Sequence, residues 1–396
     1  MIYSRKGGFS VFSLLLAIIY MAFISLGLPD GLLGAAWPSM VGQFQVPLSY
    51  AGIISIIIAA GTVTSSLLSD KVNRKFGTGW VTAISVLMTA LALAGFAWSK
   101  SFWLLCFLAI PYGLGAGGVD AALNNYVALH FASRHMNWLH CFWGVGAIFG
   151  PYIMGWALGA GYGWPTGYGA VAIIQFVLVA CLFLSLPLWK KKAAVEADQD
   201  ETLPPIGLRK AVAIPGVASA MLAFFFLCAF ENTASLWASS YLVDFRHMAP
   251  DIAASYASLF YLGVAGGRFA CGFVSDRIGD KNMIRIGAAG MLLGIGLIAL
   301  PLESPIFTLV GLLVMGIGNA PVFPAIIHSA PVYFGRQRSQ VIIGILMASA
   351  YTGILSMPSV FGLIAQYIHI GFYPLFLGVC SLLLLVLTER VNRICQ

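Results

Sequence analysis

The chain has 396 residues, of which 60% are hydrophobic and only 9% are charged, and its formal net charge is +7. Soluble domains average roughly 45–50% apolar and about 25% charged residues, so most of this protein's surface cannot face water. The basic residues lie in loops between apolar runs and form no continuous stripe, which argues against a nucleic-acid partner. The sequence has no GxxxxGK[ST] phosphate loop and no catalytic triad pattern, so it predicts neither an ATP-driven transporter nor an enzyme.

Twelve apolar runs follow one another along the chain, and each is long enough to cross a bilayer as a helix. The first run is longer than the core of a signal peptide, lacks an A-x-A site and contains Pro29 and Asp30, so we interpret it as a span. The predicted fold is an all-α membrane protein with twelve transmembrane helices. In chain order the runs cover 10–36, 47–69, 78–98, 102–129, 138–160, 167–189, 211–241, 252–275, 283–301, 305–328, 339–367 and 370–388.

The positions of Lys and Arg predict the orientation, because cytoplasmic loops carry an excess of them. With the N-terminus inside, only Lys100 and Arg246 of the 21 basic residues fall on the outer side, which leaves 19 on the cytoplasmic side, Arg268 among them. We therefore expect both termini in the cytoplasm and the protein in the cell (plasma or inner) membrane. The seven cysteines lie mostly inside apolar runs without a CxxC pair, so no metal site and no cofactor are predicted.

A charged, proline-containing segment at 190–210 divides the chain into two similar halves. It predicts a six-helix bundle over 1–189, a cytoplasmic linker over 190–210, and a second six-helix bundle over 211–396. The sequence SSLLSDKVNRKFG from Ser65 matches GRFACGFVSDRIGDK from Gly267, and the Gly-Leu-Gly at 113–115 matches the Gly-Ile-Gly at 316–318. Such a parallel repeat predicts two bundles related by pseudo-two-fold symmetry, the plan of many secondary transporters.

The two repeated loops resemble the signature cytoplasmic motif of the major facilitator superfamily. Asp70 and Asp276 stand in its acidic positions, but the first copy has Asn73 where glycine is common. The resemblance implies that these loops control the conformational change. The predicted gating residues are Asp70, Arg74, Asp276 and Arg277.

Within that superfamily, three segments resemble the fucose permease type of sugar symporter and sodium-dependent glucose transporter-like relatives. They are GLPDGLLGAAWP from Gly27, GGVDAALNNY from Gly117 and NWLHCFWGVGAIFGP from Asn137. Fucose permease has an acidic residue in span one and a Glu followed four residues later by Asn in span four. Asp30, Asp120 and Asn124 stand in the matching positions, and His140 stands where that permease has Gln. The resemblance implies that these residues line the transport pathway.

Three acidic residues lie inside apolar runs, namely Asp30, Asp120 and Glu231. A carboxylate at the centre of a bilayer costs about 2.5–3.5 kcal/mol on insertion scales, and protonation or a bound cation removes most of that cost. We therefore expect all three to couple solute binding to a proton or cation. The alternatives are a structural hydrogen bond for Asp30, a helix cap for Asp120, and an ion pair for Glu231.

Polar and aromatic side chains in the spans are the candidates for solute contacts. Amides and carboxylates can bond sugar hydroxyls, and aromatic rings can stack on a sugar ring, although Trp and Tyr also mark the membrane interface. Glycines 144, 146, 150 and 155 are expected to let span five approach a neighbouring helix closely. The predicted solute-binding residues are Asn124, Asn125, His140, Glu231, Trp37, Trp237, Tyr351 and Asn319.

Together these patterns predict a symporter that couples a proton or sodium ion to a small polar solute, with a sugar favoured. It would work by alternating access between 1–189 and 211–396, as a monomer in the lipid bilayer. The alternative is a proton-coupled exporter of amphiphilic compounds on the same fold, because both classes use buried acids.

Overall fold

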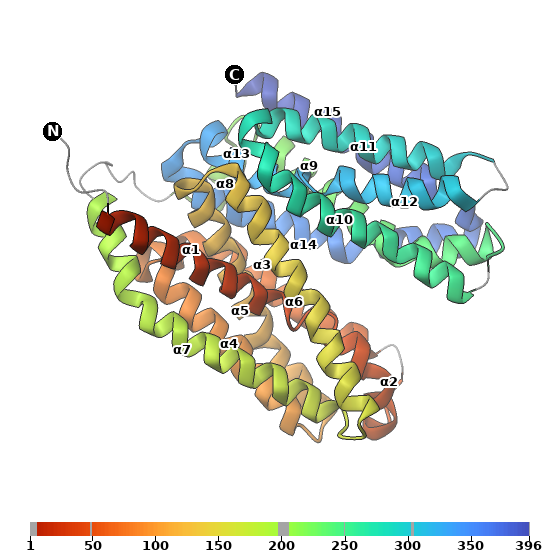
Figure 1. Ribbon diagram of the computed structural model, residues 1–396, viewed down its shortest axis with the longest axis horizontal. Helices are drawn as coiled ribbons and strands as arrows, with labels where there is room; N and C mark the ends of the chain where they lie inside the picture. Colours follow the sequence, from red (N-terminus) through yellow and green to blue (C-terminus); the bar gives the residue numbers. More distant parts are fainter. Residues whose placement is uncertain (1–5, 48–49, 197–205, 249, 302–304, 396) are drawn as a thin grey trace. The chain divides into compact units, whose positions relative to one another are not determined.

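The computed structural model describes residues 6–47, 50–196, 206–248, 250–301 and 305–395, and all regular secondary structure in these ranges is helical. The predicted all-α fold is confirmed. The chain divides into two compact units (Figure 1). Unit 1 comprises Met1–Tyr126 and Leu139–Pro205, and unit 2 comprises Val127–Trp138 and Ile206–Gln396.

Unit 1 contains the first six spans except for residues 127–138, which belong to unit 2. The helices α4 and α7 pack side by side, and α1 packs against both (Figure 1). The helix α7 continues into the predicted linker as far as Glu196, because the sequence KKKAAVE there consists largely of good helix formers. Residues 197–205 of that predicted linker lie outside the described residues. The helices are α1 (Lys6–Gly27), α2 (Leu32–Phe44), α3 (Ala51–Phe76), α4 (Thr78–Trp98), α5 (Phe102–His130), α6 (Ser133–Gly159) and α7 (Trp164–Glu196).

Unit 2 contains the other six spans and the short helix α8 (Leu208–Val212). Its helix α9 packs on α14 and α15, and α12 packs on α10 and α11 (Figure 1). A single turn of π-helix and a 3-10 turn, Ala365–Phe372, join α14 to α15. The helices are α9 (Val217–Asp244), α10 (Pro250–Ile278), α11 (Asp280–Ala299), α12 (Pro305–Asn319), α13 (Val322–Phe334), α14 (Ser339–Ile364) and α15 (Tyr373–Ile394).

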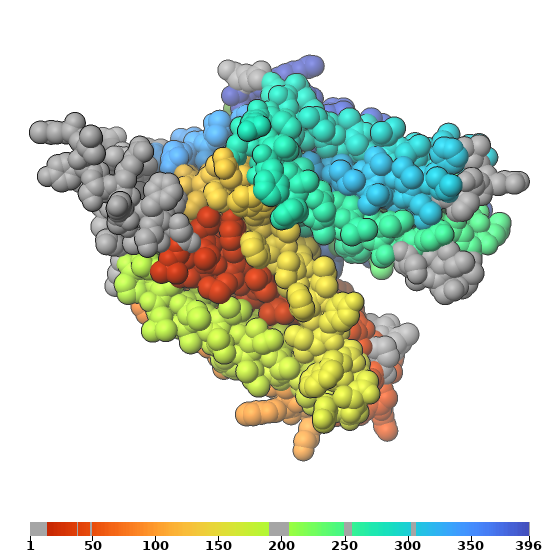
Figure 2. Space-filling model, in the orientation of Figure 1, coloured from red at the N-terminus to blue at the C-terminus, as the bar shows by residue number. Residues whose placement is uncertain are grey.

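Eleven stretches of the described chain are helical, apolar and long enough to cross a membrane. The last of them, Arg336–Ile394, contains the two helices α14 and α15, so counting these separately gives the predicted twelve spans. Large apolar side chains cover the outside of the helices, as a lipid-facing surface requires. On α6 and α7, which lie on the visible face of unit 1 in Figure 2, they include Ile148, Phe149, Tyr152, Trp156, Ile173 and Val177.

Close backbone contacts between helices recur in the two units at equivalent positions. A Cβ atom on Gly61 of α3 would lie 3.1 Å from the Cα of Gly113 on α5. A Cβ atom on Gly263 of α10 would also lie 3.1 Å from the Cα of Gly316 on α12. Small residues let helix backbones approach in this way in membranes. The internal repeat read from the sequence is therefore present as a repeated helix contact.

The predicted close packing of span five is confirmed at two of four glycines. A Cβ on Gly146 would overlap the carbonyl oxygen of Ile24, and a Cβ on Gly150 would overlap that of Leu28. The prediction is wrong for Gly144 and Gly155, since a Cβ on either would meet nothing within 4 Å. These two glycines lie on other faces of α6, away from the contact.

Candidate functional site

The first span is broken in its middle, where the chain carries Asp30. The helix α1 ends at Gly27 and α2 begins at Leu32. Between them Gly31 has φ +80°, a left-handed conformation that glycine adopts without steric cost, and Pro29 cannot donate a backbone hydrogen bond. The first span is therefore interrupted, and Asp30 lies at the break.

The side chain of Asp30 is accessible at the surface of unit 1, and Trp143 of α6 holds it. The Nε1 of Trp143 donates to Oδ2 of Asp30 at 3.0 Å. An accessible carboxylate in the middle of a span is too costly to face lipid, so this side of unit 1 is the one suited to line an aqueous pathway. The second predicted acid, Asp120, is close enough to Asp30 to interact with it electrostatically.

Asp120, Asn124 and His140 form one buried hydrogen-bonded cluster. The Nδ2 of Asn124 donates to Oδ1 of Asp120 at 2.7 Å and to the backbone oxygen of Asp120 at 3.0 Å. The other amide atom, Oδ1 of Asn124, lies 3.2 Å from Nε2 of His140, so it accepts a hydrogen bond when Nε2 carries a hydrogen. One helical turn separates Asp120 from Asn124 on α5, and α6 supplies His140. The structure thus adds His140 to Asp120 and Asn124, which their spacing in the sequence already places on one face of a helix.

Unit 2 holds a charge pair between Glu231 and the buried Arg268. The Nη2 of Arg268 on α10 lies 3.3 Å from each carboxylate oxygen of Glu231 on α9. The Nδ2 of Asn319 on α12 donates to Oε2 of Glu231 at 2.8 Å. Two predicted solute residues, Glu231 and Asn319, therefore touch each other, and the ion-pair interpretation of Glu231 gains support.

The placement of Arg268 in a cytoplasmic loop is wrong. It lies inside α10, more than two turns before Ile278, and only 4% of its surface is accessible. A charged residue at such a depth needs a partner, and Glu231 supplies it. The sequence signal was available, because Arg268 falls within the apolar run 252–275.

The other predicted solute residues lie on α2, α5, α9 and α14. Trp37 is 4% accessible and packs in the core of unit 1, with its ring centroid 6.3 Å from that of Phe102. Trp237 donates its Nε1 hydrogen to the backbone oxygen of Pro358 at 2.9 Å. Asn125 on α5 is 7% accessible, and Tyr351 is a partly buried residue of α14.

The two repeated loops hold their acidic residues in different ways. On α3, Nε of Arg74 donates to Asp70 at 3.0 Å, one turn along the same helix. Because Asn73 replaces the usual glycine, α3 continues to Phe76 and ends at Gly77, which has φ +78°. In the second copy α10 ends already at Ile278, before Gly279 with φ +79°.

Asp276 has no such arginine one turn further along its helix and is bound from another helix instead. It accepts a hydrogen bond from the backbone N–H of Arg134 at 3.0 Å, and the Arg134 side chain also contacts it. The sequence did not identify Arg134 as its partner. The predicted gating residue Arg277, next to Asp276 on α10, is exposed.

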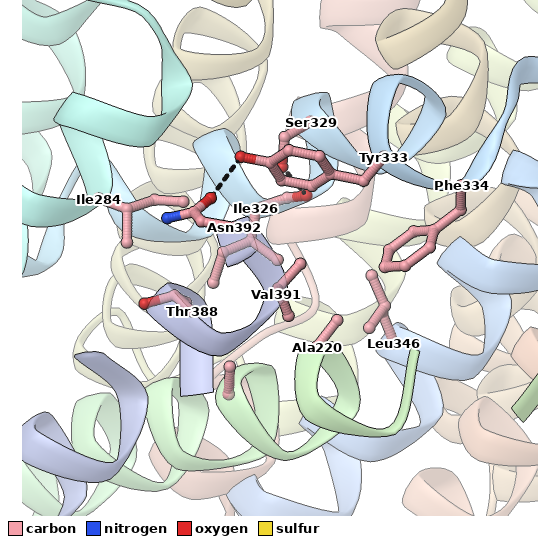
Figure 3. A pocket seen from close by; sticks show the side chains of 11 residues that line it. Ala220, Ile284, Ile326, Ser329, Tyr333, Phe334, Leu346, Thr388, Val391 and Asn392 are labelled. Carbon is pink, nitrogen blue, oxygen red and sulfur yellow. Dashed lines mark hydrogen bonds between the residues drawn. The ribbon is translucent and has the colours of Figure 1, made fainter. Parts of the chain in front are cut away.

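One small cavity inside unit 2 lies between α9, α11, α13, α14 and α15 (Figure 3). Its volume is about 20 Å³, room for about one water molecule. The Tyr333 hydroxyl donates to Oδ1 of Asn392 at 2.6 Å on its wall (Figure 3). Most of its other lining residues are apolar, so it is a packing gap and too small for a sugar.

Comparisons with known proteins agree with this architecture. The family model described as Major Facilitator Superfamily matches residues 14–256 and 220–392. The chain is 23% identical over 344 residues to the glucose/mannose transporter of Bacillus subtilis, covering 84% of each chain. It is also 23% identical over 392 residues to "Bypass of stop codon protein 6" of Saccharomyces cerevisiae, covering 89% of this chain and 77% of that one.

A solved structure shows the same fold. The chain is similar to the crystal structure of FucP, the E. coli fucose:proton symporter, in its outward conformation. The TM-score is 0.75 at 15% identity, and the match covers 96% of this chain and 99% of that one. At this identity the likeness establishes the fold alone.

Proposed function

The chain belongs to the major facilitator superfamily of membrane transporters, and from this premise we propose that it imports a small neutral polar solute together with a proton or a sodium ion. It is a transporter and not an enzyme. Within the proposal, a hexose or deoxyhexose is the favoured solute. The cycle is alternating access between the bundles 1–189 and 211–396.

The observation that carries the coupling is the accessible carboxylate of Asp30 at the break between α1 and α2. A carboxylate at this depth is most stable when a proton or cation neutralises it. A solute that binds beside it changes the stability of the charged form, and by linkage the charge state changes the affinity for the solute. Asp120, buried nearby with Asn124 and His140, is the second proposed coupling residue.

The charge balance of unit 2 supports a neutral solute. Arg268 could bind an anionic solute, but its charge is already neutralised by Glu231, and Asn319 donates to the same carboxylate. This leaves a polar, net-neutral group of side chains, which suits hydroxyl-bearing solutes. The relative named as a glucose/mannose transporter and the structural neighbour named as a fucose:proton symporter support a sugar as the solute.

We further propose that both termini lie in the cytoplasm of a cell whose plasma or inner membrane holds the protein, and that a monomer is functional. The basic residues of the loops support this orientation, although Arg268 no longer contributes to it. The loop residues Asp70, Arg74, Asp276 and Arg277 are proposed to control the conformational change.

Uptake into proteoliposomes tests the proposal. Purified protein is reconstituted, and labelled hexoses, deoxyhexoses and nicotinate are supplied under imposed inward proton or sodium gradients. We expect one of the sugars to accumulate above its equilibrium level under one of the gradients. Nicotinate, which is an anion, should not accumulate. Extrusion of a cationic dye with no flux of any sugar would overturn the proposal and favour the exporter.

A further inference from the structure

His328, on α13, is held between two groups that both accept hydrogen bonds. Its Nδ1 lies 2.6 Å from Oδ2 of Asp280, and its Nε2 lies 3.1 Å from the backbone oxygen of Phe131. A backbone oxygen can only accept, so Nε2 must carry a hydrogen. A carboxylate can also only accept, so Nδ1 must carry a second hydrogen unless Asp280 is itself protonated.

The pair therefore holds one proton more than a neutral imidazole and a carboxylate would hold together. Whether this proton sits on Nδ1 or on Oδ2, the 2.6 Å contact needs it, because two lone pairs at that distance repel each other. Histidine is the side chain whose ordinary titration falls between about pH 5 and 8. The contact is thus a site for one exchangeable proton.

This site fastens the connection between α5 and α6, the segment Val127–Trp138 that belongs to unit 2. Phe131 supplies the backbone oxygen bound by His328. Ser133 donates from its hydroxyl to Oδ1 of Asp280 at 2.7 Å. His328 and Asp280 thus hold this connection through two of its residues.

The charged and titratable groups around the site come from each helix packed against it. Asp276 of α10 adds a negative charge near His328, but Arg134 of α6 is bound to that carboxylate. His135 of α6 lies beside Arg134, and Tyr333 of α13 lies near Asp280. The group in direct hydrogen-bond contact with the His328 ring and able to exchange a proton with it is Asp280.

We propose that His328 and Asp280 form a proton-binding site that keeps the α5–α6 connection docked on unit 2, and that losing this proton releases the connection. Under the orientation proposed above, which is the one part of the proposed function used here, the proton comes from the cytoplasm. Any movement of this connection away from α11 and α13 must break the bonds of Asp280 to Ser133 and of His328 to Phe131. Cytoplasmic acid then favours the docked state.

Hydrogen exchange of the intact protein in lipid nanodiscs tests this inference. Exchange of the backbone amides of Val127–Trp138 is measured from about pH 6 to 8 and corrected for the chemical pH dependence. One proton per docking event allows protection to fall by at most about tenfold per pH unit. In the wild type we expect the protection of these amides to fall by nearly tenfold for each unit by which the pH rises. In His328→Gln and Asp280→Asn the protection should be independent of pH.

A matched control is His369→Gln, which alters another histidine of unit 2 that accepts a hydrogen bond from the backbone N–H of Gly371. This variant should keep the wild-type pH profile. A wild-type profile without pH dependence overturns the inference even if neither variant folds, and so does an unchanged pH dependence in His328→Gln. The measurement needs no transported solute, so its failure is distinguishable from a failure of the proposed function.

Discussion

The indole of Trp143 donates a hydrogen bond to the carboxylate of Asp30 at 3.0 Å, although 113 residues separate the two in the chain. This bond fixes the break in the first span against α6. It involves Oδ2 of Asp30, a residue that is exposed in unit 1. The carboxylate is therefore both held in place and available to a second ligand.

Asp30→Asn should abolish accumulation of the solute against its gradient, because an amide cannot take up a proton or neutralise a cation. Counterflow exchange of labelled for unlabelled solute should continue, since it needs no net cation movement. Both are measured in proteoliposomes. Asp244→Asn, at the exposed end of α9, is the matched control and should keep gradient-driven accumulation. Accumulation retained in Asp30→Asn would remove Asp30 from the coupling step.

Asn124→Leu should destabilise the protein, because the change removes one hydrogen-bond donor to the buried Asp120 carboxylate and one contact of the buried His140 ring. A buried polar group that loses its partner costs about 1–3 kcal/mol, against an average of about 0.6 kcal/mol for an ordinary hydrogen bond between membrane helices. Thermal unfolding in detergent measures the difference. Asn232→Leu, which removes an amide that donates to the backbone oxygen of Cys228 on its own helix, should cost clearly less. Equal losses would contradict a stabilising role for the cluster of Asp120, Asn124 and His140.

Glu231→Gln should lower the free energy of unfolding by about 3 kcal/mol, because it removes the carboxylate charge that pairs with the buried Arg268. Arg268→Gln should have a similar effect for the opposite charge. The double variant should lose less than the sum of the two, since no isolated charge remains. Unfolding of all four proteins in one detergent gives the coupling energy, and additive losses would show that the two charges do not interact.

Gly146→Ala should destabilise unit 1, because the new Cβ would overlap the carbonyl oxygen of Ile24 and force α1 and α6 apart. Gly144→Ala is its control on the same helix. With open space at that position, it should be neutral or stabilise the helix by up to about 1 kcal/mol. Reversal of this order in thermal unfolding would refute the described contact between α1 and α6.

The spans, the break at Asp30 and the approach of Asn124 to Asp120 could be predicted from the sequence. Length and apolarity fix a membrane helix, and Asp120 and Asn124 stand one helical turn apart. The helical period would also have shown which glycines of α6 share one face. At 3.6 residues per turn Gly150 lies about 40° from Gly146 around α6, whereas Gly144 and Gly155 lie about 160–180° away on the opposite side.

Partners on other helices could not be predicted in the same way. A span that is apolar all round shows no periodicity to indicate which face meets which neighbour. Arg268 falls within an apolar run, but nothing in the sequence indicates that its partner is Glu231, 37 positions earlier. Likewise, nothing local to Phe131 indicates that its carbonyl oxygen is bound by a histidine 197 positions later.

The paired glycines of α3 and α5, and of α10 and α12, have a mechanical consequence. Helices whose backbones touch without side chains between them lie too close for any rotamer change to separate them, so each pair should move as a rigid body. Flexing within either half must then take place at its other helix interfaces, where larger side chains can repack. The duplicated contact thus gives each half of the molecule one pair of helices that moves as a rigid body.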